Sequence, residues 1–196
     1  KLPEEVDGPE MQIVRHEMLA DFVKRVKELA SSRGKVVSCI APRNFEENRR
    51  RGLDVEPLVR RGLVESVMVG AGHEDRRLFT ERNGQPPVDF DDLEPLKELK
   101  ALGTARIFTG GLGGWTDADR KTGARRMSEA LAAGLDGGFF WDVQGHFDRR
   151  WDEVRRFGTR THLEDVLADR CPGPRLRQTL RFHDLNVDRY KPWNAY

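Results

Sequence analysis

Four short apolar runs, separated by segments with helix signals, constrain the fold of this chain more than any other feature. The runs span residues 35–41, 64–69, 105–109 and 136–141. Their starts lie 29, 41 and 31 residues apart, and a barrel of eight strand–helix units averages about 31 residues per unit. Each run is continuously apolar rather than alternating, which is typical of parallel strands that are covered on both faces.

The segment before the first run has the periodicity of an amphipathic helix. Apolar residues recur there at steps of three and four, and Gly34 follows where a helix stop is expected. The periodic residues are Met18, Leu19, Phe22, Val23, Val26 and Leu29. We therefore expect a helix that ends shortly before the first strand.

Capping residues mark the helices between the other runs. Asn44 with Glu47 resembles a capping box. The further expected helices begin at Asp54 and end near Gly62, begin at Asp91 or Asp92 and end near Ala101, and begin at Thr116 and end at Ala133. Residues 76–88 form an insertion whose Asn-Gly pair is a hairpin signal. This order of strands and helices predicts an α/β protein of the (β/α)8 TIM-barrel type, here half a barrel.

The pattern loosens toward the end of the chain, which suggests two regions. Residues 1–158 are expected to form the half barrel. Residues 159–196 are expected to pack on it as a helix near 162–169, a candidate edge strand at 176–182 and an irregular tail.

Composition excludes several classes of function. The 34 Lys and Arg residues nearly balance 33 Asp and Glu residues, so the net charge of +1 predicts no bulk attraction to nucleic acid. No apolar run approaches the roughly 20 residues of a membrane-spanning helix. The arginine clusters at 49–51 and 125–126 stand beside acidic residues and are interpreted as solvated helix faces.

The cysteines indicate neither a disulfide framework nor a zinc site. Cys39 lies in an apolar run and is expected to be a buried thiol, and Cys171 is the second cysteine. We predict no metal and no cofactor. The chain opens with Lys1 and shows no signal-peptide core, so the sequence does not indicate a cellular compartment. A polysaccharide hydrolase would be secreted or periplasmic.

Active sites of such barrels lie at the carboxyl ends of the strands, and this rule selects the candidate residues. Arg43 follows the first run and could bind sugar hydroxyls, or else form an ion pair at the rim. His73 and Glu74 follow the second run as an acid/base pair, or else belong to an ordinary polar loop.

The third and fourth runs end in the most distinctive sequences. A loop with four glycines leads to Trp115, which is either a stacking platform for a sugar or a packing residue. Asp142 ends the fourth run between Trp141 and His146 and is the best-placed carboxylate, with an ion pair to a nearby arginine as the alternative. The glycine loop does not match a phosphate-loop fingerprint.

Several segments, in order along the chain, resemble one family. They read VRHEMLADFVKRVKELASSRGKVVSCIAPR at 14–43, GLDVEPLVRRGLVESVMVG at 52–70, AGLDGGFFW at 133–141 and VDRYKPWNAY at 187–196. These segments resemble the bacterial glycoside-hydrolase-like (β/α)8 barrel proteins, which are related to the family-ten-like glycosidases. The resemblance implies that the four runs are strands five to eight, with residue 1 just after the fourth strand.

This resemblance implies a glycoside-hydrolase-like protein that acts on a carbohydrate. Asp142 and Glu74 would then be the catalytic carboxylates, and the substrate-binding residues would be Arg43, His73, Trp115, Trp141 and His146. The alternative is a non-catalytic carbohydrate-binding or scaffold barrel that lacks a complete carboxylate pair. Since four strands cannot close a barrel, we expect either a missing N-terminal half-barrel or a second copy as partner.

Overall fold

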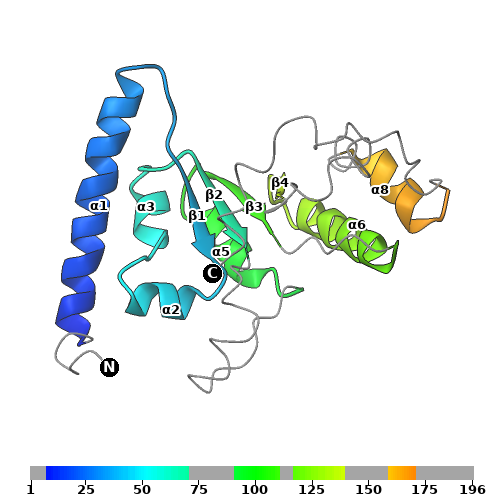
Figure 1. Cartoon of the computed structure of the whole chain (residues 1–196), viewed down its shortest axis with the longest axis horizontal. Helices are drawn as coiled ribbons and strands as arrows, with labels where there is room; N and C mark the ends of the chain where they lie inside the picture. The colour runs from blue at the N-terminus through cyan, green and yellow to red at the C-terminus, as the bar shows by residue number, and fades with distance from the viewer. Residues whose placement is uncertain (1–7, 71–90, 111–116, 140–158, 171–196) are drawn as a thin grey trace, which may run out of the picture.

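The computed structural model describes residues 8–70, 91–110, 117–139 and 159–170, in which helices and strands alternate (Figure 1). The elements are, in chain order, α1 (Pro9–Ser31), β1 (Ser38–Pro42), α2 (Phe45–Arg50), α3 (Glu56–Arg60), β2 (Ser66–Gly70), α5 (Glu94–Ala101), β3 (Arg106–Thr109), α6 (Asp117–Ala132), β4 (Gly137–Gly138) and α8 (Arg160–Leu167).

The strands form one parallel sheet of four strands, in the order β1-β2-β3-β4. The register places Val67 opposite Cys39 on one side and opposite Ile107 on the other. The α/β class and the adjacent parallel strands in sequence order are therefore confirmed. The strands begin one to three residues later than the apolar runs. The last part of the fourth run, from residue 140 onward, lies outside the described residues.

The short helices begin where the capping residues predict. In each case a side-chain oxygen accepts a hydrogen bond from a backbone N–H in the first turn of the helix. The pairs are Asn44 Oδ1 with Glu47 N at 2.9 Å, Asp54 Oδ1 with Glu56 N at 3.1 Å, and Asp92 Oδ1 with Glu94 N at 3.0 Å. Asn44 is the N-cap of α2, and such a cap contributes about 1 kcal/mol to helix stability. Asp54 and Asp92 stand one residue before the N-caps Val55 and Leu93.

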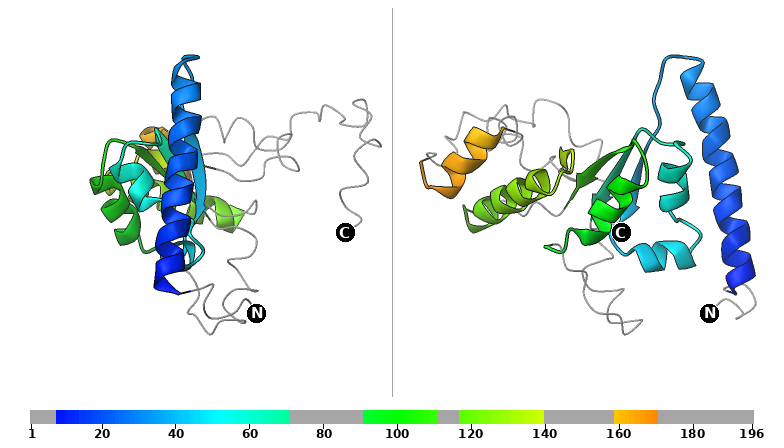
Figure 2. Two further views of the ribbon diagram at one scale, coloured as in Figure 1. Left: turned by 90° about the vertical axis from the view of Figure 1, so that its left-hand side faces the viewer. Right: turned by 180° about the vertical axis from the view of Figure 1, so that it is seen from behind.

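The two faces of the sheet differ in what covers them. Val67, Val69 and Ile107, which are odd-numbered strand residues, are fully buried in a core that includes residues of α3 and α5. Figure 2 shows these helices on one side of the sheet. Even-numbered residues lie on the other face, because side chains alternate along a strand. There Ile40 is 51% exposed and Phe108 is half-buried.

Helix α1 has the predicted position but not the predicted burial. Leu19 and Val23 pack against the core, whereas Met18 and Phe22 are 68% and 64% exposed. The helix is turned by its polar contacts with α3 and the residues around it, since Lys27 Nζ donates to Glu65 at 3.1 Å and to the Gly62 carbonyl. These contacts point only part of the periodic face toward the core.

The end of the described chain forms a small second cluster. Helix α8 packs on α6 through the buried side chains of Ala124, Met127, Leu163 and Val166. A helix near residues 162–169 is thereby confirmed as α8. The candidate edge strand at 176–182 and the tail lie outside the described residues. Among the helices that are described, none has the length and apolar character needed to cross a membrane.

Candidate functional site at the carboxyl ends of the strands

The carboxyl ends of three parallel strands meet at one edge of the sheet. Pro42 ends β1 opposite Gly70 of β2, and the register continues to Gly110 directly after β3. The Gly110 N–H donates to the Val69 carbonyl at 2.6 Å and so extends the ladder by one bond. This edge is where ligands bind in open and closed parallel sheets.

Arg43 lies at this edge and spans all three strands. It follows β1, yet its Nη1 donates to Thr109 Oγ1 at the end of β3 at 3.3 Å. Its Nη2 donates to the Asp92 carbonyl just before α5. The side chain is buried, with 5% of Arg43 exposed. Since a guanidinium stays charged at any accessible pH, the edge contains a fixed positive charge.

The backbone at the end of β1 is tied down as well. Asn48 of α2 is buried and its Nδ2 donates to the Pro42 carbonyl at 2.7 Å. Thr109 is buried, and its Oγ1 donates to the Gly110 carbonyl at 3.2 Å. These bonds satisfy backbone oxygens that a short strand would otherwise leave open. The edge is therefore held in place by side-chain hydrogen bonds from α2 and β3.

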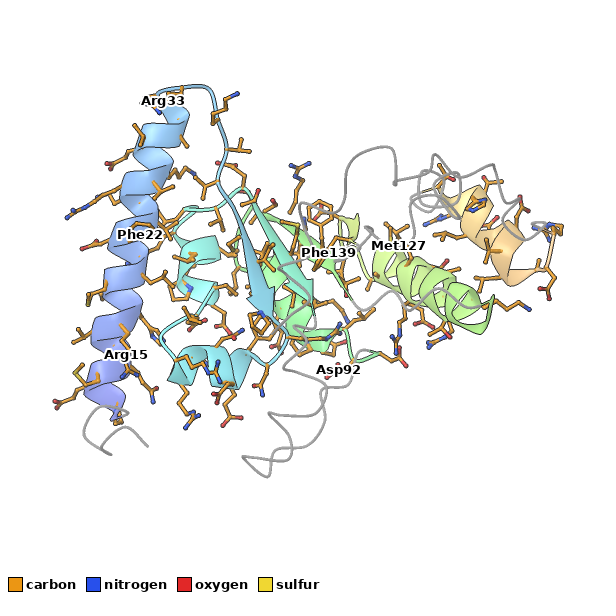
Figure 3. The ribbon with its side chains drawn as sticks, in the orientation of Figure 1. Arg15, Phe22, Arg33, Asp92, Met127 and Phe139 are labelled. Atoms are coloured by element: carbon orange, nitrogen blue, oxygen red, sulfur yellow. The ribbon has the colours of Figure 1, made fainter. Side chains whose placement is uncertain are left out.

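A ring lies over two glycines at the same edge. A Cβ built on Gly70 would stand 2.6 Å from Cζ of Phe139, and one on Gly110 would stand 2.8 Å from the Gly70 Cα. The Phe139 ring thus rests directly on the backbone of β2 and β3. Figure 3 shows Phe139 beside the sheet. Only glycine leaves room for this approach.

Three carboxylates of the described residues lie near this edge, and each has polar partners. Asp91 lies 2.7 Å from Nε of Arg126, and the hydrogen bond from Arg126 is the main reason that the pKa of Asp91 is lowered. Asp92 caps α5. Glu47 of α2 is buried, and hydrogen bonds from Arg50 and Arg51 lower its pKa. All three acids therefore contribute to the scaffold through hydrogen bonds.

Of the residues predicted to form the site, Arg43 lies in the described part of the chain. The others lie outside it, and their convergence at the strand ends stays a prediction: His73, Glu74, Trp115, Trp141, Asp142 and His146. Within the described ranges no group of three His, Cys, Asp or Glu side chains is arranged to hold a metal ion.

Sequence reasoning missed two contributors to this edge, Thr109 and Phe139. Thr109 ends an apolar run and Phe139 lies within one, and the pattern within a run does not tell a lining residue from a core residue. The glycines do carry a signal, because Gly70 and Gly110 each directly follow an apolar run. A glycine at that place in two neighbouring strands indicates a close approach, but it does not name the approaching ring.

The fold and this edge define a parallel α/β protein with a polar and aromatic strand-end site. Comparisons with models of known families, with curated proteins and with solved structures give no match to this chain. Its assignment therefore rests on the residues and on the geometry of the described parts.

Proposed function

We propose that this chain is a glycoside-hydrolase-like protein that binds a carbohydrate at the carboxyl ends of its strands. The observation that carries the proposal is the anchored guanidinium of Arg43 at an edge where Phe139 covers two bare glycines. Sugars present hydroxyl groups and apolar ring faces. Binding sites for small molecules combine apolar walls with a few fixed polar groups, as this edge does.

Catalysis would require two carboxylates beside this edge. A retaining or an inverting glycosidase uses one as a general acid and the other as a nucleophile or a general base. We assign these roles to Asp142 and Glu74, which follow the fourth and second apolar runs of the sequence. Arg43 would orient the sugar and favour the ionised form of a neighbouring carboxylate.

One observation favours the alternative, a carbohydrate-binding protein without catalysis. The described strand ends present Pro42, Gly70 and Thr109, and none of these residues can act as an acid or a base. Among the described residues, the acids near the edge are engaged in ion pairs and in hydrogen bonds to helix N–H groups. A barrel that kept its binding edge but lost one catalytic carboxylate would show this pattern.

An assay on a panel of polysaccharides separates these functions. Release of reducing ends that drops at least 100-fold in Asp142→Asn and in Glu74→Gln, with unchanged sugar binding, supports the hydrolase. The matched control is Glu98→Gln, which removes an exposed carboxylate on α5. Sugar binding without hydrolysis by the unaltered protein supports the alternative. Absence of both binding and hydrolysis across the panel overturns the proposal.

A further inference from the structure

The molecule has one large apolar surface that its described residues do not cover. It consists of apolar side chains on α1 and on β1 with the residues before it, each between 36% and 68% exposed: Met11, Val14, Met18, Phe22, Val26, Leu29, Val36 and Ile40. Contiguous apolar patches of more than about 300–600 Å² are rare on monomers. Eight large apolar side chains at this exposure are more than the scattered single ones that a monomer normally shows.

The position of the exposed residues around the axis of α1 follows from helix geometry. Each residue of a helix is turned by about 100° from the one before it. Around α1 this places Glu17 toward α3, where it binds Arg61 at 2.6 Å, followed by Ala20 and Val23 on the core. Leu19 comes next, and the exposed stripe follows beyond it. The stripe therefore continues the core-facing surface around α1, and Arg15, which lies within the same range of angles, contacts Gly52 after α2.

The β1 part is the edge of the sheet. In the part of the chain that the structure describes, β1 pairs with β2 and with no other strand. β1 is also the strand that stands nearest to α1 (Figures 1 and 2). An apolar strand edge with unpaired backbone groups is costly in water and is normally covered. The stripe of α1 and the edge of β1 together fit a further strand that is parallel to β1 and shielded by α1.

We propose that a second copy of this chain supplies that strand, with β1 of each copy paired to β4 of the other. In the described parts of the chain, the parallel sheet in the order β1-β2-β3-β4 has two different ends, and a single foreign strand would cover one of them. A two-fold axis covers both ends at once, because each copy offers the edge that the other lacks. Eight strands are the number at which side chains just fill a closed barrel.

A barrel closed by two copies would also cover the face of the sheet that carries the even-numbered residues. Ile40, Met68 and Phe108 occupy one layer across β1, β2 and β3. In a closed barrel such layers interdigitate with those from the opposite strands and become the core. Both copies would place Arg43 at the same rim. The inference concerns assembly and holds whether or not the carbohydrate proposal does.

Size-exclusion chromatography with light scattering tests the assembly. The chain of 22.5 kDa is expected to run as a dimer of about twice that mass. Phe22→Glu is expected to yield monomers, since it places a charge within the stripe. Lys24→Glu is the matched control, because it places the same residue on the same helix outside the stripe, and it should remain dimeric. A monomeric unaltered chain, or a dimeric Phe22→Glu, overturns the proposal.

Hydrogen exchange provides a readout that does not depend on a variant folding. Amides of β1 should exchange more slowly as protein concentration rises through the dimerisation range, whereas amides of the central strand β2 should change far less. Exchange from β1 that is independent of concentration contradicts the proposed pairing.

Discussion

Arg43 and Thr109 join the ends of β1 and β3 across the intervening strand, through a hydrogen bond of 3.3 Å from Nη1 to Oγ1. Both residues are buried, at 5% and 3% exposure. A bond between two buried polar groups contributes modestly when it is made and costs more when one partner is lost. The pair therefore fixes the edge on which the proposed function depends.

Removing the hydroxyl from this pair should destabilise the fold. Thr109→Val keeps the shape of the side chain but leaves the guanidinium of Arg43 with one acceptor fewer. We expect the free energy of unfolding to fall by about 1–3 kcal/mol, measured by urea denaturation. Ser32→Ala, at the end of α1, removes an exposed hydroxyl that donates to Leu29 and should cost less than half as much. Equal losses in both variants would contradict the role of the pair.

The close contact of Phe139 with the two glycines predicts that Phe139→Leu restores stability more in one glycine variant than in the other. Gly70→Ala and Gly110→Ala should each lower stability by about 1–3 kcal/mol, since overpacking forces neighbours to move. Phe139→Leu should recover part of the loss in Gly70→Ala, where the ring is the obstacle. It should recover less in Gly110→Ala, where the Gly70 backbone is the obstacle. Thermal unfolding of the single and double variants measures the coupling, and identical recovery in both contradicts this geometry.

Asp136 predicts a loss of stability in acid. Burial alone would raise its pKa, but hydrogen bonds from Lys100 and from the Ile107 N–H outweigh that effect and lower the pKa below 3.8. A group whose pKa is lowered on folding stabilises above its unfolded pKa and loses that contribution as the pH falls through the folded value. Unfolding free energies measured from pH 6 to pH 2.5 should therefore decline less in Asp136→Asn than in the unaltered protein.

Asp21→Asn is the control for that comparison, because it removes an exposed carboxylate from α1. Its curve shows how much of the change comes from removing any one surface carboxylate. If Asp136→Asn also follows the unaltered curve, the carboxylate does not contribute in the way its contacts indicate.

Cys39 should react slowly in the folded state. Burial raises the pKa of its thiol to about 11, so little of the reactive thiolate exists at pH 8. In a Cys171→Ser background, alkylation by iodoacetamide should be at least 100-fold slower in native buffer than in urea. Rates that agree within a factor of about 3 would show that the thiol is accessible and ordinary in its pKa.

Local sequence patterns predicted much of the fold. Continuous apolar runs predicted the strands, and Asn44, Asp54 and Asp92 predicted the starts of three helices. These signals work at short range, because a cap and the first turn that it stabilises lie within three residues. The parallel order followed from the alternation of strand and helix, which leaves few other topologies.

The site was only partly foreseen. The rule of strand ends selected Arg43, which does lie at the carboxyl edge of the sheet. It did not predict that the side chain is buried or that its partners lie 66 and 49 residues further along the chain. No local pattern encodes a contact over that separation.

Helix α1 shows most clearly which features the sequence determines and which depend on the tertiary structure. Its periodicity determined that a helix forms and that apolar residues line it. Whether Leu19 or Phe22 faces the core depended on where α3 and β1 lie, and Phe22 is 64% exposed as a result. Helix periodicity fixes the angles between side chains, which are a property of one element. The direction of burial is a property of two elements in contact, and only their packing decides it.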